Sequence, residues 1–441
     1  MNLAEQAILQ QIDTDELTRR VAMAHAWEAY LTGPKKQLKV RPGQPDDNVV
    51  VNYARMIVDK GVAFLFGKDI RLETDPDTDD TPEEAWLRGF WAYNGGMVTL
   101  QKLATNGGVC GHAFAKLVPG QPFPRLIVID PAYVTVRTDP DDIDQVLWYV
   151  IAYTTTNPET GKPMNVRQVI ERMGTVWQIT DEVSYGAGGW QTRADMPWPY
   201  AWPPIIDCQN LPLPNSYWGL ADLEPDVLGL NDSIDFALSN LSRIIRYHAH
   251  PKTWGKGFAA SEMSTAPDET IVLNNPLAEL HNLEMISDLS SSLELYERLK
   301  DSIHETTNIP AISAGRMDNL GQLSGVALQI LYQPLLEQTE TKRRTYGRLV
   351  TEASRRAAAL AGMGEDVRPE IVWPSMLPQN QLEERQTAMI DMQLGASRDT
   401  LLQKLGYNPA DEATKRAQEQ SETVGAQLLD LLQGGGDGGE L

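Results

Sequence analysis

The glycines, serine and lysine that could build a phosphate-binding or hydrolytic site stand at the wrong spacing in this chain. Five residues separate Gly61 from Gly67, where a Walker A loop has four, and Lys68 is followed by Asp instead of the Ser or Thr that would hold magnesium. Residues 321–325 contain Ser324 but miss the nucleophile-elbow pattern by one glycine position. The sequence therefore predicts no ATPase, and a turn glycine explains the second pattern better.

Two groups of potential metal ligands also lack essential members. Asp75, Asp77 and Asp79 have the spacing of an EF-hand loop, but its sixth and twelfth positions are Asp and Trp instead of Gly and Glu. His304 and Glu305 lack the second histidine of a zinc-protease helix. We expect no metal and no cofactor, and leave open only a weak divalent-ion site between subunits.

The chain has two cysteines, Cys110 and Cys208, which argues against a disulfide framework and is typical of a reducing cytoplasm. His112 lies close enough to Cys110 to raise the hypothesis of a catalytic thiol. Buried cysteine is more often a small hydrophobe, and we favour that interpretation. Because the sequence shows no convergent polar site, we expect a protein that is not an enzyme.

One dense basic cluster lies in the C-terminal half of the chain, and two interpretations are open. It is either a solvated helix face paired with Glu337 and Glu340 at helical spacing, or a set of inter-subunit salt bridges or a ring facing DNA phosphates. The cluster consists of Lys342, Arg343, Arg344 and Arg348.

Two helices and a loop must position this cluster. Apolar residues at spacings of three and four predict a helix over residues 287–307, and a second, longer helix over residues 324–361 carries the basic cluster. Residues 308–323 between them contain a proline and two glycines and predict an irregular loop. Pro334 lies inside the long helix, so we expect a kink. A long kinked helix is suited to hold such a loop out into a space.

Helices are also expected in the N-terminal part. The first covers residues 13–31, with Asp13 and Glu16 as its capping pair. The second covers residues 49–66, and the third begins after Thr81, which is followed by Pro and by a capping-box Glu.

The middle of the chain is rich in β-branched residues. Because the expected strands follow one another closely, they favour antiparallel hairpins over βαβ units. Residues 190–214 are dense in Pro and Trp and predict an irregular linker. The expected strands cover residues 125–130, 133–137, 145–156 and 175–180.

A heptad stripe over residues 220–248 predicts a long helix, acidic in its first half and basic in its second, as the helix dipole favours. It fits a buried bundle helix and equally a helix packed beside copies of itself in a ring. Further expected elements are strands over residues 269–274 and 370–373, helices over 379–394, 397–405 and 411–432, and a disordered tail over 434–441.

Composition bounds the class of protein. The 441 residues can form two or three domains, and no apolar run approaches the length of a membrane span, so we expect no membrane partner. The net charge of −22 argues against tight nucleic-acid binding. It fits either simple solubility or a channel wall that repels a sliding duplex.

Residues 308–349 read NIPAISAGRMDNLGQLSGVALQILYQPLLEQTETKRRTYGRL and resemble the tunnel-loop region of tailed-bacteriophage portal proteins of the SPP1-like family. The order of the other segments agrees with this resemblance. It implies an α+β portal fold with a mixed wing (1–216), a stem helix (217–250), a small α/β clip (251–286), a second stem helix (287–307), a tunnel loop (308–323), a long kinked helix (324–361), a wing strand (362–378), crown helices (379–433) and the tail (434–441).

The resemblance implies a head-to-tail connector, which is a ring at the capsid portal vertex of the virion. The family implies twelve copies in this ring, assembled in the host cytoplasm. Such a ring conducts double-stranded DNA without reading its sequence. Implied partners are the large terminase, a head-completion or adaptor protein, and capsid and scaffolding proteins. Another capsid or connector protein, or a helical enzyme of unrecognised type, are the alternatives. The implied tunnel loop contains Ser313, Ala314, Gly315, Arg316, Met317, Asp318, Asn319, Leu320 and Gly321.

Overall fold

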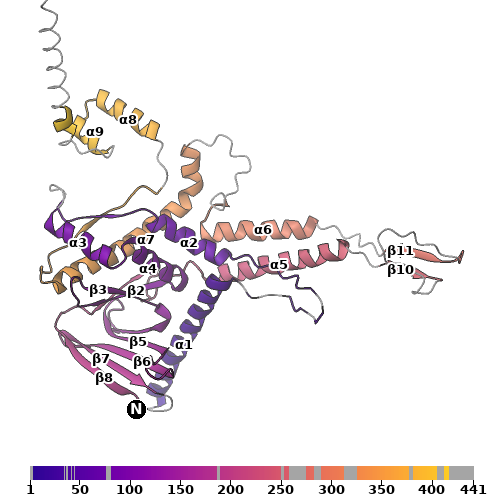
Figure 1. The fold of residues 1–441 in the computed structure, drawn as a ribbon, viewed down its shortest axis with the longest axis horizontal. Coiled ribbons are helices and arrows are strands. Elements are labelled where there is room, and N and C mark those ends of the chain that lie inside the picture. The colour runs from indigo at the N-terminus through magenta and orange to yellow at the C-terminus, as the bar shows by residue number, and fades with distance from the viewer. Residues whose placement is uncertain are drawn as a thin grey trace, which may run out of the picture. The chain divides into compact units, whose positions relative to one another are not determined.

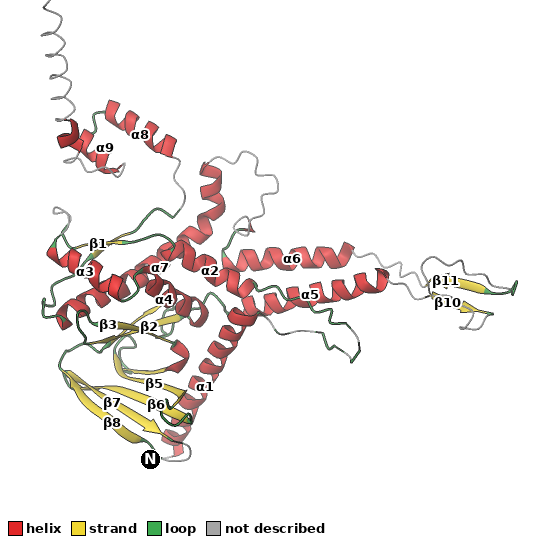
Figure 2. Cartoon of the chain, viewed as in Figure 1, coloured by secondary structure: helices red, strands yellow, loops and turns green. Residues whose placement is uncertain are grey.

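The computed structural model divides the chain into two compact units. The larger contains Met1–Leu323 and Ala327–Pro374, and the smaller contains Ser324–Val326 and Ser375–Leu441. Helices and antiparallel sheets are both present, so the expected α+β class is confirmed (Figures 1 and 2). The described residues are 3–33, 35, 38–40, 42–43, 45–75, 81–185, 189–249, 253–257, 275–282, 290–311, 325–376, 381–404 and 412–416.

Helices dominate the N-terminal part of the larger unit. The expected start of the third helix is confirmed, because the Thr81 hydroxyl accepts a hydrogen bond from the Glu84 N–H at 3.2 Å and Pro82 occupies the first turn. The helices are α1 (Leu3–Thr32), α2 (Tyr53–Phe66), α3 (Pro82–Tyr93) and α4 (Met97–Cys110).

The first two helices begin elsewhere than the sequence predicts. The cap expected at Asp13 is wrong, because α1 already begins at Leu3 and the Glu16 carboxylate pairs with Arg19 at 2.5 Å instead of closing a first turn. Helix α2 begins after residue 52, not at residue 49, because the Asn52 side chain caps it by accepting from the Arg55 N–H at 2.8 Å.

Two antiparallel sheets form the middle of the chain, in strand orders β3-β2-β9 and β4-β5-β6-β7-β8, which confirms the expected hairpins. The irregular linker expected at residues 190–214 is wrong, because this region contains β8 and β9 and buries Trp198, Trp202 and Ile205. The strands are β2 (His112–Val118), β3 (Arg125–Ile129), β4 (Val134–Thr138), β5 (Val146–Thr156), β6 (Pro163–Met173), β7 (Val176–Ser184), β8 (Gln191–Trp198) and β9 (Ile205–Gln209), with the 3-10 helix η1 (Pro131–Tyr133) between β3 and β4.

Two long helices, α5 (Pro225–Ala249) and α6 (Ser290–Thr307), lie side by side (Figure 1). They correspond to the helices expected over residues 220–248 and 287–307. Between them in the chain, β10 (Thr253–Lys256) and β11 (Glu279–Asn282) pair antiparallel. The strand expected over residues 269–274 lies outside the described residues.

Helix α7 (Gly325–Leu360) is the long helix predicted with an internal proline. Figure 2 shows that it changes direction along its length, as expected from the N–H that Pro334 lacks. The strand expected near residues 370–373 is β12 (Glu370–Val372). It pairs antiparallel with β1 (Arg71–Glu73), a strand that the sequence pattern does not predict.

The smaller unit contains α8 (Gln381–Gln393) and α9 (Arg398–Lys404), close to the expected bounds. Of the helix expected over residues 411–432, residues 412–416 are described and helical, and the tail at 434–441 lies outside the described residues. None of the described helices combines the length and apolar character that a membrane crossing requires.

Helix α7 supplies one side of the main core of the larger unit. Its buried face includes Leu349, Val350 and Ala353, which belong to one cluster with Phe90 of α3 and Leu103 of α4. Fully burying one large apolar side chain stabilises a fold by about 1.5–3 kcal/mol, so this face fixes the helix firmly. A second cluster joins α1, α2, α5 and α6, and a third fills the space between the two sheets and the end of α7.

Candidate functional site

The basic cluster of α7 does not form one exposed face. The Lys342 and Asp222 side chains are each only 6% exposed, and Lys342 Nζ lies 2.7 Å from Asp222 Oδ1 and 2.6 Å from Oδ2. Asn210 Nδ2 donates to the same carboxylate at 3.1 Å, and the Asp222 N–H donates to the Gly108 carbonyl at 2.7 Å. Lys342 therefore ties α7 to the segment that precedes α5, and its burial removes it from any exposed basic surface.

Arg343 is also used within the chain. Its guanidinium donates to the Pro374 carbonyl at 2.7 Å and lies 5.0 Å from the centre of the Trp373 ring. Burial lowers the pKa of this guanidinium, while Glu340, 3.8 Å away, opposes the shift. The predicted pairing with Glu340 is thus present, whereas Glu337 accepts a hydrogen bond from Gln333 at 2.7 Å.

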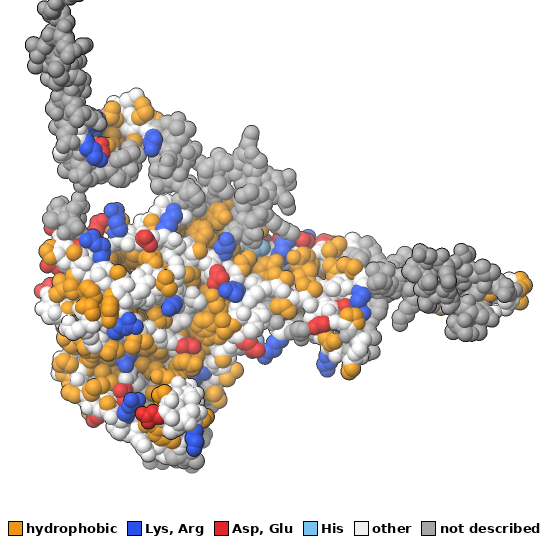
Figure 3. All heavy atoms as spheres, viewed as in Figure 1, with side chains coloured by type: hydrophobic (Ala, Val, Ile, Leu, Met, Phe, Trp, Pro, Cys, Tyr) orange, Lys and Arg blue, Asp and Glu red, His pale blue; other side chains and the backbone are white. Residues whose placement is uncertain are grey.

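Arg344 and Arg348 are the exposed members of the cluster, one helical turn apart on α7. The visible face of the larger unit carries both signs of charge, interspersed with apolar side chains (Figure 3). On that face no single charge sign dominates. Within the cluster, Arg344 and Arg348 are therefore the members that an anion outside the chain could contact.

Arg348 borders a cavity of about 1170 Å³ between α7 and the sheets. Glu352 and Arg356 continue this wall along α7, and Tyr149 of β5 and Asp207 of β9 line it from the sheets. The cavity therefore combines charged side chains of both signs with aromatic walls.

Asp207 is the centre of a polar network beside this cavity. Its carboxylate accepts hydrogen bonds from Tyr217 at 2.7 Å, Tyr149 at 3.2 Å and His112 Nε2 at 2.9 Å. Burial would raise the pKa of Asp207, but the bonds and charge of His112 and the bonds of both tyrosines lower it. Burial and the charge of Asp207 raise the pKa values of the Tyr149 and Tyr217 phenols well above the usual range for tyrosine. These shifts favour an ionised carboxylate and protonated phenols, and the hydrogen bonds of the network join β2, β5 and β9 to the segment that contains Tyr217.

No sequence pattern predicts this network. His112 and Tyr149 lie 95 and 58 positions from Asp207, and the local signal is a single Asp inside the apolar strand β9. His112 is buried, and its ring stacks on Phe114 and Tyr217 with ring centres 4.7 and 4.9 Å apart while Nε2 bonds Asp207.

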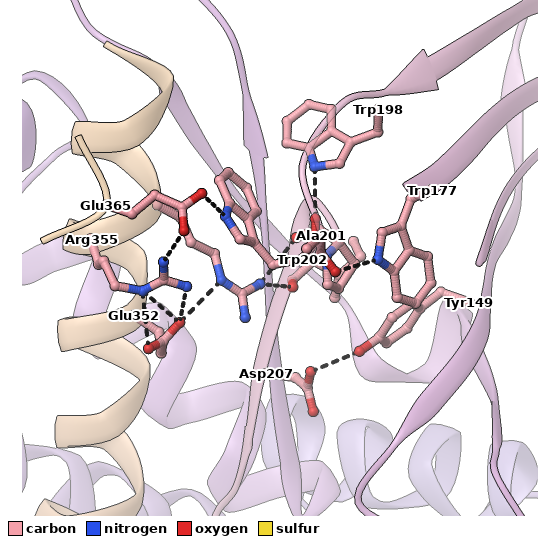
Figure 4. Close-up of polar contacts among 12 residues, drawn as sticks. Tyr149, Trp177, Trp198, Ala201, Trp202, Asp207, Glu352, Arg355 and Glu365 are labelled. Atoms are coloured by element: carbon pink, nitrogen blue, oxygen red, sulfur yellow. Dashed lines mark hydrogen bonds and ion pairs between the residues drawn. The ribbon is translucent and has the colours of Figure 1, made fainter. Parts of the chain in front are cut away.

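A second polar network fastens the C-terminal part of α7 to the sheets (Figure 4). Arg356 donates to the Pro203 carbonyl at 3.0 Å and to the Ile205 carbonyl at 2.7 Å, and bonds Glu352 at 3.2 Å. Burial would raise the pKa of Glu352, but hydrogen bonds and charges from Arg355 and Arg356 lower it. Burial lowers the pKa of Arg356 itself, an effect that Glu352 opposes. The network is thus a set of fixed ion pairs.

The other candidate residues behave as structural groups or lie outside the described part. Cys110 is buried, and burial raises the pKa of its thiol, so it is not an activated nucleophile. His304 Nδ1 lies 2.9 Å from the Ile309 carbonyl, at the end of α6. Within the residues that the structure describes, no three His, Cys, Asp or Glu side chains gather as a metal site. The predicted tunnel-loop residues 313–321 lie outside the described residues.

Comparison with known proteins identifies the fold. Among solved structures, the chain is similar to one in the neck of an empty GTA particle computed with C6 symmetry, with a TM-score of 0.55 and 14% identity over 88% of this chain and 94% of that chain. It is also similar to a chain in the virion of a native gene transfer agent (GTA) particle, with a TM-score of 0.50 and 15% identity over 89% and 99% of the two chains. At such identities the likeness shows a shared fold.

The comparison with sequences is more specific. No curated protein matches the chain. The family described as "Phage portal protein, SPP1 Gp6-like" matches residues 10–426, a range that includes all the helices and sheets described above except the first turns of α1. The chain therefore belongs to the SPP1 Gp6-like family of phage portal proteins.

Proposed function

We propose that the protein is a portal subunit that forms a ring at one vertex of a phage capsid. The family implies that this ring has twelve copies. Its task is to conduct DNA during packaging and ejection. The observation that carries this proposal is the family match over residues 10–426, which spans the helix pair, the segment between α6 and α7, and α7 itself. The similar fold in the neck of a GTA particle supports a location in the virion.

The segments take the following roles in this proposal. The α5–α6 pair is the stem, and the residues around β10 and β11, which lie between these helices in the chain, are the clip. Residues 1–216 and 362–378 form the wing, because β1 pairs with β12 across this sequence separation. Residues 308–323 are the tunnel loop and residues 379–433 the crown.

The mechanism is mechanical. A channel must let a duplex slide, and each phosphate neutralised by a fixed cation adds salt-dependent affinity. The net charge of −22 and the burial of Lys342 both reduce such binding. Arg344 and Arg348 are the exposed basic groups of the cluster, available for pairing with a neighbouring subunit or with the DNA backbone. Sequence readout is not expected, because backbone contacts carry no sequence information.

The proposed partners follow from this position in the particle. The clip docks the large terminase during packaging and a head-completion or adaptor protein afterwards, and the wing and crown face the capsid and scaffolding proteins. Assembly takes place in the host cytoplasm. The terminase supplies ATP hydrolysis, since this chain has no Walker A loop.

An enzyme is the second candidate function, and the cavity beside Asp207 is the feature that favours it. A catalytic acid or base works best with a pKa near the operating pH. The pKa of Asp207 is lowered and those of Tyr149 and Tyr217 are raised, both away from neutrality. We therefore favour the structural role.

The experiment that tests the ring is electron microscopy of the purified protein, with the symmetry counted in end-on views. Rings with a central hole are the expected result. A phage that lacks this gene product and still fills its capsids with DNA would refute the proposal, whatever the purified protein does.

The first prediction concerns the tunnel loop. Replacing Arg316, Met317 and Leu320 with Ala should reduce DNA packaging or retention and leave ring assembly intact, because these are the large side chains in a loop of small residues. The measurement is encapsidated DNA per particle. Unchanged packaging would remove the loop assignment. The matched control is Arg193→Ala with Met196→Ala on the exposed surface of β8, which should change neither property.

A further inference from the structure

Residues 47–54, which lead into α2, run along α5 and are held there by polar side chains spaced four residues apart. Three consecutive turns of α5 supply these side chains, and each bonds a backbone group of the segment. Asn231 accepts from the Ala54 N–H at 3.1 Å and donates to the Val51 carbonyl at 2.9 Å, Asp235 accepts from the Val51 N–H at 3.0 Å, and the Ser239 hydroxyl accepts from the Val49 N–H at 2.9 Å.

The next turn of α5 extends the same contact with charges. Arg246 lies 2.6 Å and Arg243 3.4 Å from Asp47 Oδ2, and the Asp47 side chain is only 6% exposed. The segment is therefore fixed at its start by an ion pair and along its length by hydrogen bonds. We call this row of α5 side chains, Asn231, Asp235 and Ser239, the ladder. It supplies the backbone of residues 47–54 with hydrogen-bond partners that a neighbouring strand would otherwise provide.

Asp235 is the member of this ladder whose burial is unfavourable when its carboxylate is ionised. Its residue is 1% exposed, and Oδ2 is buried without a hydrogen-bond partner among the described residues. Burial destabilises the ionised form of a carboxylate when one of its oxygens has no hydrogen-bond partner. Burial, with a smaller contribution from Asp232, raises the pKa of Asp235 from 3.8 to about 6, and the bond from Val51 opposes the shift.

The charged groups on the neighbouring elements do not compensate Asp235. On the segment itself, Asp47 is neutralised by its two arginines. On α6, Lys300 pairs with Glu297 at 2.5 Å, and His304 faces the Ile309 carbonyl. On α5, Asp232 carries a charge of the same sign and raises the pKa of Asp235 further.

We propose that Asp235 makes the attachment of residues 47–54 to α5 sensitive to protonation. With a neutral Asp235 the closed ladder buries no charge. With an ionised Asp235 the closed ladder buries a charge, and local opening of the segment returns this charge to water. The segment joins α1 to α2, so its release frees the connection between the two helices. This inference concerns one copy of the chain and does not rest on ring formation.

The sign and size of the effect follow from linkage. A group whose pKa is raised in the closed state stabilises that state below its ordinary pKa, and this stabilisation is lost as the pH rises through the raised value. With values of 3.8 in the open segment and about 6 in the closed one, opening should be about tenfold more frequent at pH 8 than at pH 5.

Hydrogen exchange of the Val49 and Val51 amides, normalised to the exchange rates of an unstructured peptide, measures this opening at pH 5 and pH 8. The wild-type chain should lose about tenfold in protection between the two values. Asp235→Asn keeps the acceptor for the Val51 N–H and removes the charge, so its protection should be the same at both. The proposal would be overturned if Asp235→Asn also lost about tenfold in amide protection between pH 5 and pH 8. It would equally be overturned if the wild-type chain showed no such loss.

Ser239→Ala is the matched control, because it removes the two hydrogen bonds between the Ser239 hydroxyl and the Val49 backbone without changing any charge. Its protection should be lower than that of the wild type at both pH values, with the tenfold ratio retained. A ratio of one in this variant would contradict the assignment to Asp235 and assign the pH dependence to the ladder as a whole.

Discussion

The buried ion pair between Lys342 and Asp222 allows a sharp test of how α7 is held. Replacing Lys342 with Met keeps a side chain of similar length and removes the ammonium that lies 2.6 Å from the Asp222 carboxylate. Both side chains are 6% exposed, so water cannot replace the lost partner freely. Breaking a buried pair in this way typically costs about 3–5 kcal/mol, because an uncompensated charge is left behind. The bond from Asn210 remains and places the expected loss near the lower limit, at about 3 kcal/mol.

The assay is equilibrium unfolding in urea, followed by the fluorescence of the 11 tryptophans, with the oligomeric state of every variant checked by sedimentation. Arg344→Met is the matched control, since it makes a comparable change two residues further along the same helix at an exposed position. Exposed substitutions of this type usually change the free energy of unfolding by less than about 0.5 kcal/mol.

A double variant separates the charge from the packing. Adding Asp222→Asn to Lys342→Met removes the isolated charge, so the double variant should be more stable than Lys342→Met alone by at least about 1 kcal/mol. A loss below about 1 kcal/mol for Lys342→Met, or equal losses for Lys342→Met and Arg344→Met, would refute the view that this pair fastens α7.

Two further substitutions test the same helix. Gly107→Ala would place a Cβ 1.8 Å from the hydroxyl of Tyr346, which is 1% exposed and cannot move aside; we expect a loss of about 1–3 kcal/mol in urea unfolding, and an unchanged midpoint would contradict this packing. Arg356→Met would leave the Pro203 and Ile205 carbonyls without their donor, and should speed hydrogen exchange in β9 while leaving exchange in α5 unchanged. Equal effects on both elements would show a global loss of stability instead.

The long helices were predictable because their periodic apolar residues report burial directly. The stripes over residues 220–248 and 287–307 and the long basic helix all appear, and Pro334 marks a helix that bends. Capping signals were less reliable. Thr81 does cap α3, whereas Asp13 lies within α1, because a polar residue inside a helix looks the same in sequence as one at its start.

The sheets and the polar networks were harder to predict for physical reasons. Strand β6 has polar residues on both faces, and β8 contains a proline, so neither shows a clear alternation. The Lys342–Asp222 pair and the bonds to Asp207 join residues far apart in the sequence, and no local pattern encodes such a partner. The basic cluster could be found from sequence, but its division into buried and exposed members could not, because that depends on which side of α7 meets the core.

Helix α7 also has a mechanical property that follows from how its contacts are distributed. From Leu335 onward a buried residue recurs every three or four positions, and Lys342 and Arg356 add polar attachments. Before Pro334, the side chains of Ile330 and Leu331 are 69% and 43% exposed. Helix α7 is thus packed along most of its length, whereas among the described residues just before Pro334 the main packing contact is Tyr332, which stacks on Phe64 of α2 with ring centres 5.6 Å apart. A force applied to the helix before Pro334 should therefore bend it at the proline, where one hydrogen bond is already missing, and leave the packed portion in place.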